Sequence, residues 1–194
     1  KIITSAHPSL GAYMAEKTKQ PADNPRRCPW AEESSLLAKY HDEEWGVPVK
    51  TDAAHFERLS LEVFQAGLSW RTILHKRVAF RSAFARFSPQ KVSAFTEKDI
   101  RRLLDDAGIV RHRGKIGATI DNAGRLIALS KAHGGFSSYL ESLPGDLDTL
   151  RPIFRKEFRF MGPKISESYL ESVGKIPIRH HRLCWKSNLN IKRT

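Results

Sequence analysis

Four side chains near the two ends of the chain have the chemistry to bind a metal ion. Cys28 and His41 lie thirteen residues apart, and His180 and Cys184 form a His-x3-Cys pair. Two thiolates and two imidazoles are a sufficient donor set for a tetrahedral structural zinc ion. The first spacing is not that of a zinc finger, and His181 is a rival ligand. The spacing alone therefore leaves a zinc site and four unrelated residues as alternatives.

A carboxylate lies within an apolar helical stripe. Phe56, Leu59 and Val63 recur at helical spacing, and Glu62 falls inside this stripe rather than on a charged face. A buried carboxylate is costly unless it is hydrogen-bonded or faces a pocket. Glu62 is therefore a candidate functional residue, and the alternative is a helical glutamate whose carboxylate reaches solvent.

A Gly-Pro step near the C-terminus is typical of a turn that holds a phosphate. The segment 158–164 reads Phe-Arg-Phe-Met-Gly-Pro-Lys. A glycine and a proline that open a helix leave N–H groups and the helix dipole free to bind one DNA phosphate. Arg159, Gly162 and Lys164 are therefore candidate DNA-binding residues. An ordinary connection between two helices has the same pattern.

The charge of the chain favours a polyanionic partner. Lysine and arginine number 33 against 21 acidic residues, which gives a net charge of +12. Such an excess is typical of nucleic-acid binding, with an anionic membrane surface as the competing partner. No stretch is apolar for the ~20 residues of a membrane span, and the N-terminus lacks a signal-peptide core, so we expect neither a membrane protein nor a secreted precursor. The two cysteines are too few for a disulfide scaffold.

The elements that position these residues are predicted to be helices. Apolar residues recur at steps of three and four throughout the middle of the chain, and no run alternates as a strand does. We therefore predict an all-α fold of seven or so helices. The start and stop signals are Ser88-Pro89, Thr96 with Asp99, Gly108, and Gly134-Gly135.

The chain is predicted to contain one domain between two polar ends. Residues 1–26 are expected to be a lead-in that is disordered or was added for expression. Residues 27–184 are expected to form a single domain, and residues 185–194 a basic tail.

Four longer motifs are similar to those of a known family. They are Arg-Cys-Pro-Trp at 27–30, Tyr-His-Asp-Glu-Glu-Trp-Gly-Val-Pro at 40–48, Gln-Ala-Gly-Leu-Ser-Trp at 65–70, and Ala-Gly-Ile-Val-Arg-His-Arg-Gly-Lys-Ile at 107–116. Their order and spacing resemble the DNA-3-methyladenine glycosylase I family across about residues 27–184. The resemblance implies an all-helical helix-hairpin-helix glycosylase that removes N3-methyladenine from alkylated DNA in base-excision repair.

The resemblance also implies roles for individual residues. It makes Glu62 the carboxylate that reads a flipped base, and it makes a structural zinc ion the link between the two ends of the domain. The aromatic residues around the base would be Trp30, Tyr40 and Trp70. The zinc ligands would be Cys28, His41, His180 and Cys184.

The chemistry expected from the resemblance is simple hydrolysis. N3-methyladenine is cationic and leaves readily, so the enzyme mainly selects and orients it after base flipping. We expect a monofunctional enzyme, because a strand-cleaving lysine needs an assisting aspartate and residues 149–194 contain none. The expected partner is double-stranded DNA with alkylated bases. A cytoplasmic, nucleoid-associated monomer without membrane contact or an obligate protein partner is also expected.

Two other classes of function are weighed against this one. A non-catalytic DNA-binding protein would use the hairpin and the positive charge but would need neither Glu62 nor its aromatic surroundings. A zinc-dependent nucleobase deaminase is suggested by the His-x-Glu of residues 41–43, but the Pro-Cys-x-x-Cys partner motif is absent.

Overall fold

The computed structural model describes residues 25–187, and this part of the chain is helical without strands, which confirms the predicted all-α class. Within these residues there are two short 3-10 helices and nine α-helices, more than the seven or so predicted. They are η1 (Pro29–Glu33), α1 (Ser35–Glu43), α2 (Asp52–Gln65), α3 (Trp70–Ala83), η2 (Ala85–Phe87), α4 (Pro89–Ser93), α5 (Glu97–Asp105), α6 (Arg113–His133), α7 (Phe136–Ser142), α8 (Leu147–Glu157) and α9 (Pro163–Ser172).

Most of the predicted helix ends are confirmed. The Ser88 side chain caps α4 and Pro89 is its first residue, while Thr96 opens α5 with a capping box. Gly134, at φ 72°, ends α6 in the left-handed conformation that glycine adopts without strain. Gly108 is different: α5 ends at Asp105, because the Asp106 carboxylate accepts the Gly108 N–H at 2.7 Å and forms a separate turn.

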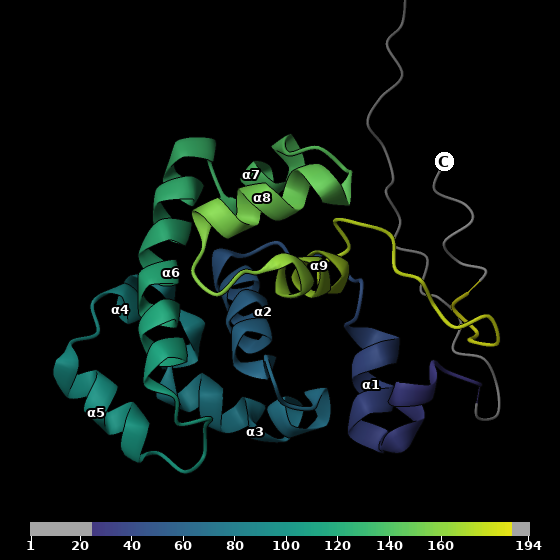
Figure 1. Ribbon diagram of the computed structural model, residues 1–194, viewed down its shortest axis with the longest axis horizontal. Helices are drawn as coiled ribbons and strands as arrows, with labels where there is room; N and C mark the ends of the chain where they lie inside the picture. Colours follow the sequence, from purple (N-terminus) through teal and green to yellow (C-terminus); the bar gives the residue numbers. More distant parts are fainter. Residues whose placement is uncertain (1–24, 188–194) are drawn as a thin grey trace, which may run out of the picture.

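Helix α2 is the centre of the fold. Figure 1 shows α2 between α6 on one side and α1 on the other, with α3 below it and α9 beside its upper end. Its buried face joins a phenylalanine-rich core with α3, α6, α7, α8 and α9. A second, smaller cluster lies at α1, where Leu37, Tyr40 and Leu74 pack with neighbouring tryptophans. The predicted base-reading residues meet in the space between α1, α2, α3 and α9.

The two ends of the described chain lie together beside α1. Trp185 donates its backbone N–H to the Arg26 carbonyl at 2.9 Å, and the Lys186 ammonium donates to the carbonyls of His41 and Asp42. Trp185 and Lys186 belong to the segment predicted as a basic tail, and here they pack on the domain. The rest of that segment, apart from Ser187, and residues 1–24 of the lead-in lie outside the described residues.

No helix within residues 25–187 is both long enough and apolar enough to cross a membrane.

Candidate functional site

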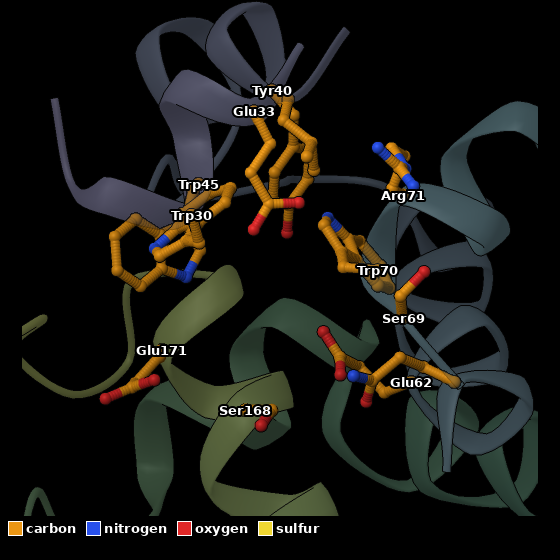
Figure 2. A pocket seen from close by; sticks show the side chains of 12 residues that line it. Trp30, Glu33, Tyr40, Trp45, Glu62, Ser69, Trp70, Arg71, Ser168 and Glu171 are labelled. Atoms are coloured by element: carbon orange, nitrogen blue, oxygen red, sulfur yellow. The ribbon is translucent and has the colours of Figure 1, made fainter. Parts of the chain in front are cut away.

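The sequence-predicted base-reading residues line one cavity of about 380 Å³. It is enclosed by η1 and α1 on one side, by α2 and α3 on another, and by α9 below (Figure 2). The structure thus brings together Trp30, Tyr40, Glu62 and Trp70, which come from four different elements. The full lining is Trp30, Glu33, Leu37, Tyr40, Trp45, Glu62, Gln65, Ser69, Trp70, Arg71, Ser168 and Glu171.

Glu62 is a buried carboxylate that lines this cavity. It lies in the last turn of α2, only 6% exposed, between the core residues Leu61 and Val63. Burial raises the pKa of the Glu62 carboxyl to about 8, opposed by the Arg58 guanidinium and assisted by Glu171. Glu62 is therefore largely neutral at pH 7, and a positive charge in the cavity would favour its ionised form.

Aromatic rings form much of the remaining wall of the cavity. The Tyr40 and Trp70 ring centroids lie 5.1 Å apart, and the Trp30 and Trp45 rings meet edge to face at 5.2 Å. The indole N–H of Trp70 is buried and has no hydrogen-bond partner among the described residues. A buried donor without a partner is costly and is suited to an acceptor on a ligand.

Arg58 holds the elements of the cavity together, and sequence reasoning missed it. Arg58 lies one helical turn before Glu62 in α2 and is buried. Its guanidinium donates to the carbonyls of Glu44 at 3.0 Å and Ser172 at 2.8 Å. It also lies 5.9 Å from the centroid of the Tyr40 ring. Arg58 therefore ties α2 to the ends of α1 and α9. No local pattern signals this role, since arginine in an amphipathic helix normally lies on the exposed face.

Two further acidic residues of the cavity were also missed. Glu33 comes from η1 and Glu171 from the last turn of α9. Glu171 and Ser168 are three residues apart and share the face of α9 that lines the cavity. That face is distinct from the one bearing Tyr169, which is part of the core.

The four predicted metal ligands form a second, separate cluster. Their ligand atoms all lie within 4.8 Å of one another. Sulfur–nitrogen distances are 3.5 Å for Cys28 to His180, 3.6 Å for Cys184 to His180 and 3.4 Å for Cys184 to His41. Zinc bonds of about 2.3 Å to sulfur and about 2.0 Å to nitrogen at a tetrahedral angle place these atoms about 3.5 Å apart. The residues fit such an ion.

The surroundings of the cluster also fit a metal ion. The Asp42 carboxylate lies 2.8 Å from Nδ1 of His41, which leaves Nε2 of this imidazole toward the sulfur of Cys184. Burial lowers the pKa of His180 to about 4, so this imidazole is neutral and its nitrogen lone pair is free. The rival His181 is outside the cluster and donates its backbone N–H to the sulfur of Cys28.

The candidate DNA-binding residues lie at the turn between α8 and α9 and in the first turn of α9, away from the acidic cavity. Arg159 and Gly162 border a shallow basic cavity with Arg125, Arg155 and Lys156. Gly162 caps α9, and a Cβ atom there would meet nothing within 4 Å, so nothing among the described residues requires glycine at this position. Glycine instead leaves the N-terminus of α9 open to an external group.

Two of these residues are not free cations. The Arg159 guanidinium pairs with Asp121 at 2.7 Å, and the Lys164 ammonium pairs with Glu167 at 3.5 Å. Both side chains remain largely exposed, at 61% and 81%. Surface pairs of this kind are weak, so either cation can exchange its partner for a phosphate.

A family model described as methyladenine glycosylase matches residues 30–152, which is more than half of the chain. The all-helical fold and the acidic, aromatic-walled cavity thus fall in the class of methyladenine glycosylases. The chain is 38% identical to the DNA-3-methyladenine glycosylase 1 of Escherichia coli (strain K12) over 76% of its own length and 90% of that protein. It is 34% identical to the DNA-3-methyladenine glycosylase of Haemophilus influenzae (strain ATCC 51907 / DSM 11121 / KW20 / Rd) over 76% and 91%.

Solved structures agree with these relatives. A crystal structure of a 3-methyladenine DNA glycosylase I superposes with a TM-score of 0.74 at 34% identity, covering 82% of this chain and 98% of the other. A structure of the Staphylococcus aureus enzyme, solved for its recognition of 3-methyladenine, gives 0.73 at 32% identity over 87% and 98%. The chain belongs to the DNA-3-methyladenine glycosylase I family of enzymes.

Proposed function

We propose that this protein hydrolyses the N-glycosidic bond of N3-methyladenine in alkylated double-stranded DNA, with Glu62 as the residue that reads the base. The observation that carries the proposal is a buried carboxyl group, its pKa raised to about 8, that faces an aromatic-walled cavity. Such a group is costly to the fold and is suited to a positively charged ligand. The relatives named above are enzymes that bear the name of this base.

Access to the cavity requires base flipping. Glu62 lies 6% exposed at the end of α2, so a base stacked inside a duplex cannot reach it. Extrusion of the nucleotide costs a few kcal/mol, and the cost is smaller for a damaged base. The cavity of about 380 Å³ is large enough to receive a single purine.

Charge recognition follows from the chemistry of the lesion. A methyl group on N3 makes the adenine of a nucleotide cationic, whereas ordinary adenine is neutral. The Tyr40 and Trp70 rings offer electron-rich surfaces to this cation. The cation favours the ionised form of Glu62, which then accepts hydrogen bonds from the base and complements its charge. A neutral base gains neither interaction.

The bond-breaking step needs little further help. When the bond between the sugar C1′ and the base nitrogen breaks, its electron pair neutralises the cationic base. Water then adds its oxygen to C1′ of the oxocarbenium-like sugar and releases a proton. Because the leaving group is already activated, the protein mainly holds it in position and excludes neutral bases.

DNA is held at the turn between α8 and α9, which we propose to be a helix-hairpin-helix. The N-terminus of α9, opened by Gly162, would bind one phosphate, with Arg159 and Lys164 beside it. The basic cavity next to this turn supports the same role.

The enzyme is proposed to leave the strand intact. The Lys164 ammonium is 81% exposed and paired with Glu167, which describes a solvated cation rather than an amine ready to attack the sugar. Residues 149–194 also contain no aspartate to assist such a step.

The buried cluster is proposed to hold one structural zinc ion. Cys28, His41, His180 and Cys184 would be the ligands and would leave no coordination position for water. The ion would supply the positive charge that keeps the two thiolates ionised, and it would join the ends of the domain 27–184. We further propose that the enzyme acts as a cytoplasmic, nucleoid-associated monomer.

The test is release of free base from methylated duplex DNA. The purified protein is incubated with the DNA, and both the free bases and the strand length are measured. We expect N3-methyladenine as the released base, with the strand unbroken until the abasic site is cleaved by alkali. DNA binding without release would favour the non-catalytic alternative, and strand cleavage before alkali would contradict the monofunctional proposal.

A further inference from the structure

A second carboxylate lies across the cavity from Glu62. Glu171 is in the last turn of α9, and Figure 2 shows it below Trp30 and Trp45, on the opposite side of the cavity from Glu62 and Trp70. Helix α9 begins at the turn proposed to hold a phosphate and ends at this wall of the cavity. Lys164 and Glu171 are seven positions apart, or about 10 Å along the helix axis.

The Glu171 carboxylate lacks the ion pairs that the neighbouring carboxylate on α9, Glu167, forms. The Glu167 carboxylate pairs with Arg151 at 3.1 Å and Lys164 at 3.5 Å. Glu171 forms no salt bridge with any residue in 25–187, although it is partly buried. Burial, and after it the charge of Glu167, raises the pKa of the Glu171 carboxyl, while the more weakly acting charges of Lys164 and Arg179 lower it. A partly buried carboxylate that forms no salt bridge has a cost that a cationic ligand can remove.

The cavity is acidic although the chain is strongly basic. Among the described residues, its lining includes Glu33, Glu62 and Glu171 against a single cationic side chain, Arg71, while the whole chain has a net charge of +12. Basic surface elsewhere suits the DNA backbone, but these carboxylates oppose it. A local excess of negative charge in a DNA-binding protein therefore indicates a cationic group that must enter this cavity.

We propose that Glu171 is a specificity-determining residue that, together with Glu62, makes the cavity select positively charged purines over neutral ones. This inference rests on the proposed function and assigns to α9 a role in reading the base as well as in holding the backbone. A cation between the two carboxylates compensates both charges. A neutral purine leaves them facing each other, so that one must take up a proton.

The groups that face Glu62 come from every element around it. Arg58 lies on α2 itself, Glu171 on α9, Tyr40 on α1 and Arg71 on α3, while Glu33 enters from η1. Of these, Glu171 opposes ionisation of Glu62 by its charge, and Arg58 favours it. Removal of the Glu171 charge should therefore ease ionisation of Glu62 while it weakens attraction of the cation.

The test compares two small probes that differ in charge. The 3,9-dimethyladeninium ion is permanently cationic, and 9-methyladenine is its neutral counterpart. Binding of each is measured by quenching of tryptophan fluorescence at pH 7.5 in the wild-type protein and in Glu171→Gln. Glu141→Gln, which removes the same charge from an exposed position on α7, is the matched control.

We expect Glu171→Gln to weaken binding of the cation about tenfold and to change binding of the neutral probe less than about twofold. Glu171→Asp, which keeps the charge, should recover part of the loss, and the control should bind as the wild type does. An unchanged preference for the cation in Glu171→Gln, or equal losses for both probes, would overturn the inference. A wild-type protein that bound neither probe would instead contradict the proposed function.

A second readout separates charge from structural support. The rate of base release from methylated DNA should rise with pH as Glu62 ionises, and this rise should move to lower pH in Glu171→Gln. A purely structural role would lower the rate equally at every pH. An unmoved pH dependence together with release at the wild-type level would contradict the inference while leaving the proposed function intact.

Discussion

The metal-ligand cluster and the acidic cavity share one helix but differ in how completely their polar groups are satisfied. Tyr40 and His41 are neighbours on α1, and one side chain lines the cavity while the other joins the cluster. Every donor of the cluster lies within 4.8 Å of the other three. In the cavity, by contrast, the Trp70 indole N–H has no partner among residues 25–187, and burial raises the pKa of Glu62 to about 8.

This difference separates groups that hold the fold from groups that serve a ligand. A closed set of four donors with the proposed zinc ion bound would stabilise the ends of the domain. An unpaired buried donor and unpaired carboxyl groups in a cavity lower the stability of the free protein. Binding of a ligand that pairs with them raises this stability again. Changes to the two regions should therefore have opposite effects on the stability of the protein.

The largest stability change is expected from loss of a cluster ligand. Cys28→Ser removes one of four zinc ligands, so we expect less than one zinc per chain and a melting temperature lower by about 10 °C. The wild type should contain one zinc ion per chain by elemental analysis. His181→Ala, which alters the neighbouring rival, is the control and should retain the metal. A metal-free wild type of full stability would contradict the assignment.

A smaller effect of opposite sign is expected at Glu62. The folded-state pKa of about 8 lies above the ordinary value of 4.5, so the folded state keeps a proton that the unfolded state loses between these two pH values. Stability of the wild type should therefore fall as pH rises from 5 to 8. Glu62→Gln should lack this fall and be more stable at pH 8 by about 2 kcal/mol.

Chemical unfolding of both proteins at pH 5 and pH 8 measures this difference. Glu43→Gln, an exposed glutamate on α1, is the matched control and should follow the wild type. A Glu62→Gln protein that is less stable than the wild type at pH 8 would show that the carboxylate supports the fold rather than the ligand.

The smallest effect is expected at the hairpin turn. Lys164→Ala removes one exposed cation from the N-terminal turn of α9, so DNA affinity should fall about threefold to tenfold. The slope of log affinity against log salt concentration should decrease by about one, because one ion fewer is released on binding. Lys131→Ala, an exposed lysine in the last turn of α6, is the control. Borohydride added during turnover should trap no covalent protein–DNA adduct. An adduct lost in Lys164→Ala would contradict hydrolysis without strand cleavage.

The helix ends and site residues that could be predicted from the sequence are those determined by residues close together in the chain. The caps at Ser88, Thr96 and Gly134 were predictable because a few adjacent residues determine them. The prediction at Gly108 was wrong because the Asp106 side chain competes for its N–H and ends the helix earlier. The resemblance supplied the cavity residues that lie in its motifs.

The positions of Arg58 and Glu171 at the cavity could not be predicted from local sequence patterns. The role of Arg58 depends on carbonyl groups at Glu44 and Ser172, which are far apart in the chain and meet only after α1, α2 and α9 have packed. Glu171 lies on α9, a helix whose sequence pattern indicates only its phosphate-binding start. Packing between distant elements, rather than local propensity, decides both positions.

The central claim is that an uncompensated carboxyl group at Glu62 enables removal of N3-methyladenine. The most direct measurement is the single-turnover rate of N3-methyladenine release from methylated duplex DNA by the wild type and by Glu62→Gln, at a pH where both are folded. The account predicts release by the wild type and a rate at least about 100-fold lower in the variant, with equal DNA affinity. Release by Glu62→Gln at the wild-type rate would contradict it.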